Sequence, residues 1–141
     1  MRIRKACIPS TSGHFSARAL ARMYGAFANG GEIDGVRLVS KERIALMQKV
    51  LTEAPDRVLS NSPIPRGVGF SMGGAINGVT GVFGPRRTTF GHDGFGGATG
   101  FGDPEVGLAI AVTINKMYAS LPGEGPTFEI CDLIRHELGV S

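Results

Sequence analysis

The stretch Phe90-Gly-His-Asp-Gly-Phe-Gly-Gly-Ala-Thr-Gly-Phe-Gly-Asp-Pro104 decides the fold of this protein. Residues 88–92 and 98–101 on its two sides are predicted strands, and residues 107–114 form a third that is nearly all apolar. The Asp103-Pro104-Glu105 turn makes the second and third strands antiparallel neighbours. An unbroken apolar strand is typical of one that is covered on both faces.

A fourth strand precedes this block, and it also contains a motif that invites a different interpretation. Val68, Phe70 and Met72 alternate with small residues, as in a strand. Within it, Gly69-Phe-Ser-Met-Gly73 fits the G-x-S-x-G elbow of α/β-hydrolases, with Ser71 as nucleophile. That elbow needs a helix immediately after the serine, and the glycine-rich residues 73–81 predict none.

Three helices complete the pattern. Ser16 is the predicted N-cap of the first helix, and Asn29-Gly-Gly31 is predicted to end it. The Asp34-Gly35 pair then predicts a tight hairpin within 32–39. The second begins at Ser40 and ends before Pro55, and the third spans about 128–138. The expected apolar stripes are Leu20, Met23, Tyr24 and Phe27; Ile44, Met47 and Leu51; and Ile130, Leu133, Ile134 and Leu138.

The order of two helices, four antiparallel strands and one helix predicts an α+β fold, with helices packed on an antiparallel sheet of about four strands. We expect a single domain over residues 1–141, with an irregular N-terminal segment over 1–15. Asp93 and Asp103 are predicted turn residues.

Composition and charge exclude several classes of protein. The chain has 141 residues, 42% hydrophobic and 19% charged, with a net charge of +3 and scattered basic residues, which argues against a nucleic-acid partner. Cys7 and Cys131 suit neither a disulfide scaffold nor a metal cluster, and the histidines lack ligand spacing. The glycines of 94–100 lead into a strand rather than a helix, so no dinucleotide cofactor is predicted. Without a signal peptide or an apolar run of about 18 residues, the sequence predicts a cytoplasmic location.

Two segments resemble a known superfamily, that of β-lactamases, D-alanyl-D-alanine carboxypeptidases and class C esterases. Residues 8–31 are similar to the helix that borders the active site in the esterases. His92-Asp93-Gly94 resembles the His-x-Gly form of the third motif, which is often Lys-Thr-Gly elsewhere. The resemblance covers about residues 8–138 and implies a partial β-lactamase/transpeptidase-like fold.

The resemblance also implies a substrate-binding site made of His92, Asp93, Gly94 and Phe95. In the family, a serine forms an acyl-enzyme, and the third motif lines the cleft. His92 would then face the substrate, Gly94 would give it clearance, and the Phe95 N–H would donate to the oxyanion. A neutral histidine in place of lysine favours a small ester or amide over a β-lactam carboxylate.

The chain departs from the family in one decisive way. It contains no Ser-x-x-Lys and no Tyr-x-Asn, and both precede the resembling region in the family. We therefore expect no catalytic residue in this chain, which would be a C-terminal fragment that is inactive alone; the alternatives are a non-enzymatic binding or structural remnant and, less favoured, a Ser71 esterase. Because the family's N-terminal strand pairs with residues 107–114, we expect a homodimer or a complementing N-terminal segment at that bare edge.

Overall fold

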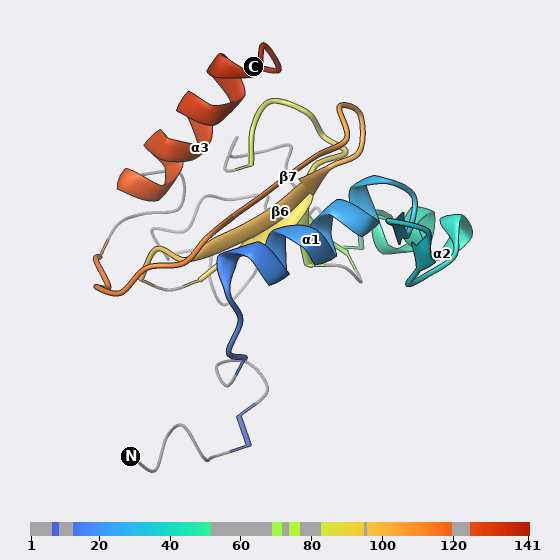
Figure 1. Ribbon diagram of the computed structural model, residues 1–141, viewed down its shortest axis with the longest axis horizontal. Coiled ribbons are helices and arrows are strands. Elements are labelled where there is room, and N and C mark those ends of the chain that lie inside the picture. Colours follow the sequence, from blue (N-terminus) through green and yellow to red (C-terminus); the bar gives the residue numbers. More distant parts are fainter. Residues whose placement is uncertain are drawn as a thin grey trace.

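The computed structural model describes residues 7–8, 13–51, 69–71, 74–76, 83–94, 96–119 and 125–141 (Figure 1). Helices α1 and α2 lie in the first half and α3 near the C-terminus. A short hairpin, β1–β2, stands apart from an antiparallel sheet in the order β3-β4-β5-β6-β7. The bounds are α1 Ala17–Ala28, β1 Glu32–Ile33, β2 Val36–Arg37, α2 Lys41–Met47, β3 Gly69–Ser71, β4 Gly74–Ile76, β5 Phe90–Asp93, β6 Thr99–Asp103, β7 Leu108–Val112 and α3 Pro126–Glu137.

The first helix and the hairpin after it confirm the local signals of the sequence. Ser16 caps α1 by accepting a hydrogen bond from the backbone N–H of Ala19 at 3.2 Å. Asp34 and Gly35 both take positive φ angles, 50° and 73°, as the two-residue turn of a tight hairpin requires. The turn joins β1 to β2, with Ile33 opposite Val36.

The second helix is shorter than predicted. It runs only over Lys41–Met47, with Gln48 as its C-cap, and Leu51 lies outside it with 58% of its side chain exposed. Of the expected stripe only Ile44 is buried. A helix of about two turns gains little from propagation, so most of its stability comes from tertiary packing.

Strand β6 has two chemically different faces, and a helix covers each (Figure 1). Gly100 and Gly102 point toward α1: a Cβ on Gly100 would lie 2.8 Å from Leu20 Cδ2, and one on Gly102 would lie 3.0 Å from the Tyr24 oxygen. Phe101 points the other way and packs with Cys131 of α3. The bare glycine face lets α1 lie directly on the backbone of the sheet.

Two aromatic groups fill the space beside β6. On the α1 face, Phe90 packs against Tyr24 and Phe27, with ring centroids 6.3 and 6.5 Å away. On the α3 face, Phe83 stacks on Phe101 at 5.3 Å. Phe90 and Phe101 are fully buried, and each such side chain contributes about 1.5–3 kcal/mol of hydrophobic stabilisation.

The buried face of α3 corrects the prediction for this helix. Of the expected core stripe, Ile134 is partly buried against the core, but Ile130, Leu133 and Leu138 are exposed by 46%, 60% and 58%. Thr127, Cys131 and Arg135 are buried instead. Arg135 tolerates burial because Asp103 pairs with it there, and no apolar pattern could show that.

The sheet has five strands rather than about four, because Gly74–Ile76 forms β4 and pairs with both β3 and β5. Three residues among glycines carry too little alternation to be recognised in the sequence. Asp93 and Asp103 are further corrections: both were predicted to be turn residues, but they end strands β5 and β6, and Asp103 is fully buried. In the part of the chain that the structure describes, no helix is long and apolar enough to cross a membrane.

Candidate functional site

The residues of the third motif lie where β5 leaves the sheet and turns toward β6. β4 pairs with β5 only at Phe90 and Gly91. His92 and Asp93 pair with β6 through Gly100 and Thr99, and no described strand pairs with their other side. An unpaired strand edge offers backbone hydrogen bonds to an extended ligand.

The pairing pattern fixes which backbone groups face that open side. The Gly94 N–H donates to the Ala98 oxygen at 2.6 Å, so the backbone groups of Gly94 point toward β6. Successive residues of an antiparallel strand point their N–H and C=O groups to alternate sides. The backbone N–H and C=O of Asp93 therefore face the open edge. Phe95, the expected oxyanion donor, lies outside the described residues.

His92 is exposed, and its ring has a defined hydrogen bond on one side. Its Nδ1 lies 2.5 Å from the backbone oxygen of Asp93. A carbonyl oxygen can only accept, so Nδ1 carries the proton. Among the described residues nothing hydrogen-bonds Nε2, which is an acceptor in the neutral ring and a donor in the protonated one.

The turn that follows the motif is held tightly by its own backbone and by two distant residues. The Gly97 N–H donates to the Gly94 oxygen at 3.0 Å. The Thr127 hydroxyl, at the start of α3, donates to the Gly97 oxygen at 2.6 Å, and the Tyr118 hydroxyl donates to Thr127 Oγ1 at 2.5 Å. The structure thus brings Tyr118 and Thr127 to the motif. We found no signal for them in the sequence.

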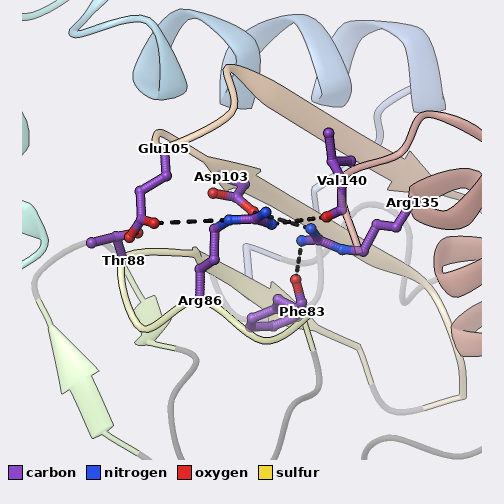
Figure 2. A network of polar contacts seen from close by, with 7 residues as sticks. All are labelled: Phe83, Arg86, Thr88, Asp103, Glu105, Arg135 and Val140. Atoms are coloured by element: carbon purple, nitrogen blue, oxygen red, sulfur yellow. Dashed lines mark hydrogen bonds and ion pairs between the residues drawn. The ribbon is translucent and has the colours of Figure 1, made fainter.

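A second polar network lies at the far end of β6 and surrounds the fully buried Asp103 (Figure 2). Arg135 Nη1 is 3.0 Å and Arg86 Nη1 is 3.4 Å from Asp103 Oδ2. Arg86 also donates to the Val140 oxygen at 2.8 Å, and Arg135 donates to the Phe83 oxygen. These contacts join α3 and the segment before β5 to the sheet, so the network is structural.

Ser71, the alternative nucleophile, lies in the wrong structural context for that role. It is the last residue of β3 and pairs with Gly74 of β4 across a hairpin. The next described element is therefore a strand, whereas a nucleophile elbow leads into a helix.

Other reactive groups in the described part of the chain do not form a site. Burial, with a smaller contribution from Asp132, raises the pKa of the Cys131 thiol to about 11, so it stays protonated and unreactive at neutral pH. Burial also raises the pKa of Tyr24. No group of three or more His, Cys, Asp or Glu in the described residues could hold a metal ion.

Comparison with known proteins gives a family and a fold for the chain. Residues 3–128 match the β-lactamase family model. The chain is 42% identical over 115 residues to the esterase/β-lactamase LipL of Mycobacterium tuberculosis, a match that covers 81% of this chain and 25% of that protein. The chain thus spans about a quarter of the length of this curated relative.

Solved structures show the same fold. A family VIII carboxylesterase superposes with a TM-score of 0.70 at 30% identity, covering 86% of this chain and 31% of that one. A penicillin-binding protein homolog from Caulobacter crescentus gives 0.69 at 33% identity, covering 77% and 28%. With a family model that matches most of its length and an α+β fold shared with these two structures, this chain belongs to the β-lactamase family.

Proposed function

We propose that this chain forms one wall of the active site of a serine hydrolase that cleaves small esters or amides through an acyl-enzyme. The observation that carries the proposal is the edge of β5 at His92 and Asp93, where no described strand pairs with the side away from β6. There, a substrate can lie along the strand, with Gly94 giving clearance and the Phe95 N–H donating to the oxyanion. His92 contributes its Nε2 to the substrate.

An ester is the favoured substrate. A β-lactam carboxylate is best bound by a permanent positive charge, which lysine supplies and a neutral imidazole does not. In neutral His92 the one ring proton is on Nδ1, which donates it to the Asp93 backbone oxygen. Nε2 therefore carries no proton and is a hydrogen-bond acceptor. That atom can accept a hydrogen bond from an N–H or O–H group of the substrate, and it has no proton to offer to an anion. The similarity to an esterase/β-lactamase and to a carboxylesterase supports this choice.

The nucleophile comes, in this proposal, from residues other than these 141. The sequence contains neither Ser-x-x-Lys nor Tyr-x-Asn, so the chain by itself does not hydrolyse the substrate. It acts when a complementing segment carrying both motifs joins it, as one half of a split site or as part of a longer polypeptide. The cytoplasmic location stays a prediction.

Strand β7 is the proposed place of association. It is the last strand in the order of the sheet, and its five residues Leu108–Val112 are all apolar. A strand with one unpaired apolar edge is prone to pair with another chain. We propose that a complementing segment or a second copy adds a strand there. Sizing chromatography with light scattering that finds only monomer at high concentration would contradict this.

The function is tested first with the purified chain and a short-chain nitrophenyl ester, beside a chromogenic cephalosporin. We expect no turnover of either. Turnover that disappears in Ser71→Ala would overturn the proposal in favour of the serine of the G-x-S-x-G motif.

The second test gives the chain its missing motifs. In a chimera, residues of this chain replace the matching 115 residues of the relative from M. tuberculosis. We expect the chimera to hydrolyse the ester, His92→Ala to lower kcat/KM by about tenfold or more, and Ser71→Ala to change nothing. A folded chimera that hydrolyses neither probe would favour the binding or structural remnant.

A further inference from the structure

We infer that Tyr118 and Thr127 are positioning residues, which fix the third-motif turn through a relay of hydrogen bonds from the start of α3. The inference rests on the proposed function, because it concerns the same site. Neither residue touches the substrate in this view. Both act through Gly97 and Gly94.

The relay begins at the Tyr118 hydroxyl, which takes the place of a side-chain cap at the N-terminus of α3. Gly125, the N-cap of α3, has no side chain to bond the first N–H groups, and Pro126 follows it. Tyr118 supplies the acceptor instead, because its hydroxyl oxygen receives the Thr127 N–H at 3.2 Å. The N-terminal end of α3 is thereby joined by a hydrogen bond to the segment after β7.

The same hydroxyl passes the connection on to the turn. Tyr118 donates to Thr127 Oγ1 at 2.5 Å, and Thr127 donates to the Gly97 oxygen at 2.6 Å. Each hydroxyl is both donor and acceptor, so the bonds polarise one another in the same direction. Thr127 is 1% exposed, so its side chain is shielded from water, and Tyr118 and Gly97 are half-buried.

The relay ends at Gly94, the glycine of the third motif. The Gly97 N–H donates to the Gly94 oxygen, and the Gly94 N–H donates to Ala98. A movement of Gly97 therefore moves both ends of the turn that contains the proposed oxyanion donor.

Side chains and backbone of the 117–118 segment lie against the turn at its two middle glycines. Gly96 and Gly97 take φ angles of 107° and 109°, and a Cβ on Gly96 would lie 2.7 Å from Met117 Cε. The ring of Tyr118 blocks the same space beside Gly97. The Tyr118 N–H also donates to the Gly96 oxygen at 3.1 Å. The turn is thus held at both Gly96 and Gly97 by the 117–118 segment.

Hydrogen exchange of the backbone amides, read by NMR on the purified chain, tests the relay. Thr127→Val loses the hydrogen bond to the Gly97 oxygen, and Tyr118→Phe loses both hydrogen bonds between Tyr118 and Thr127. In each variant we expect the Gly94 and Gly97 amides to exchange about tenfold faster, because the restraint on the turn is weakened. The Phe101 amide, in the middle of β6, should change less than about twofold. Thr127→Ser keeps the hydroxyl and should restore the exchange rates of the wild type.

The matched control is Thr89→Val. Thr89 is also fully buried, but its hydroxyl has no hydrogen-bond partner among the described residues. Its loss should leave the turn amides unchanged. Unchanged turn amides in Thr127→Val, or an equal acceleration of all amides, would overturn the inference.

Enzyme kinetics in the chimera separate positioning from stability. Thr127→Val should lower kcat about tenfold with KM within about twofold, and Thr127→Ser should restore it. A stable variant with unchanged kcat would contradict the positioning role. A chimera with no activity at all would count against the proposed function, and the exchange measurement would still decide the relay.

Discussion

Arg135 of α3 and Asp103 of β6 form an ion pair that is almost completely removed from water. Their side chains are exposed by 3% and 0%, and Nη1 lies 3.0 Å from Oδ2. The guanidinium carbon of Arg135 also lies 5.2 Å from the centre of the Phe101 ring. Asp103 Oδ1 and Arg135 Nε have no hydrogen-bond partner among the described residues. A buried pair with such unsatisfied atoms adds little net stability, but each charge depends strongly on the other.

We predict that Asp103→Asn lowers the free energy of unfolding by about 3–5 kcal/mol, because it leaves the buried Arg135 without a compensating charge. Urea unfolding followed by circular dichroism measures the change. Replacing both residues, in Asp103→Leu with Arg135→Met, should recover a large part of the loss. The exposed pair of Arg22 and Asp34 is the control: Arg22→Gln should cost less than about 1 kcal/mol. Equal losses in the buried and exposed variants would refute this account.

We predict a loss of stability at alkaline pH that depends on Cys131. Burial, chiefly, raises the pKa of its thiol from 9.0 to about 11 in the folded state. Below pH 9 both states keep the proton, so the thiol has no pH-dependent effect. Between pH 9 and 11 only the unfolded chain releases it, so the free energy of unfolding falls as the pH rises, by on the order of 2 kcal/mol.

Urea unfolding of wild type and Cys131→Ala from pH 7 to pH 11 measures that loss. The variant is less stable at neutral pH because it has a cavity, but its stability should fall less steeply above pH 9. Parallel pH profiles would show that the thiol does not contribute.

Gly25 and Gly100 both lie at the interface between α1 and the sheet, but replacing them with alanine should change the free energy of unfolding in opposite directions. Gly100→Ala places a Cβ 2.8–2.9 Å from Leu20 and Tyr24, and we expect α1 to be pushed away at a cost of about 1–3 kcal/mol. Gly25→Ala lies inside α1 and meets Ile33 at 3.4 Å. There, the higher helix propensity of alanine should add about 0.5–1 kcal/mol. Thermal unfolding of the two variants gives the sign of each effect, and a stabilising Gly100→Ala would contradict the close packing described above.

The cap of α1 predicts a smaller effect. Ser16→Ala removes the acceptor of the Ala19 N–H and should lower the free energy of unfolding by about 1 kcal/mol. Ser16→Asp keeps an acceptor and places a negative charge at the helix N-terminus, so it should retain wild-type stability or exceed it. The same unfolding measurement checks both, and an alanine variant as stable as the aspartate variant would refute the cap.

Local chemistry explains which parts of the structure could be predicted. The Ser16 cap, the Asp34-Gly35 turn and the strands around His92 depend on residues close together in the chain, so short patterns contain the information. The family resemblance gave His92, Asp93 and Gly94 a strand-turn-strand context, and the structure has His92 and Asp93 at the end of β5 with Gly94 directly after it. Their role toward substrate stays a proposal.

Contacts between distant residues explain the rest. The burial of Arg135 depends on Asp103, which is 32 residues away, and a helix pattern scored by hydrophobicity points instead to Ile130 and Leu133. The hydroxyl of Thr127 meets Gly97 across 30 residues. Neither partner carries a local signal, so these contacts appear only when the chain is folded.

The unequal faces of β6 also protect the register of the sheet. If the strand slipped by one residue, every side chain would change faces. Phe101 would then be forced into the narrow gap beneath α1, while Gly100 or Gly102 would leave a hole opposite α3. Both errors are costly at once, so mispaired forms of this strand stay rare during folding. Because β6 pairs with β5, the alternation of glycine with larger residues in β6 also fixes the position of the turn between Gly94 and Ala98.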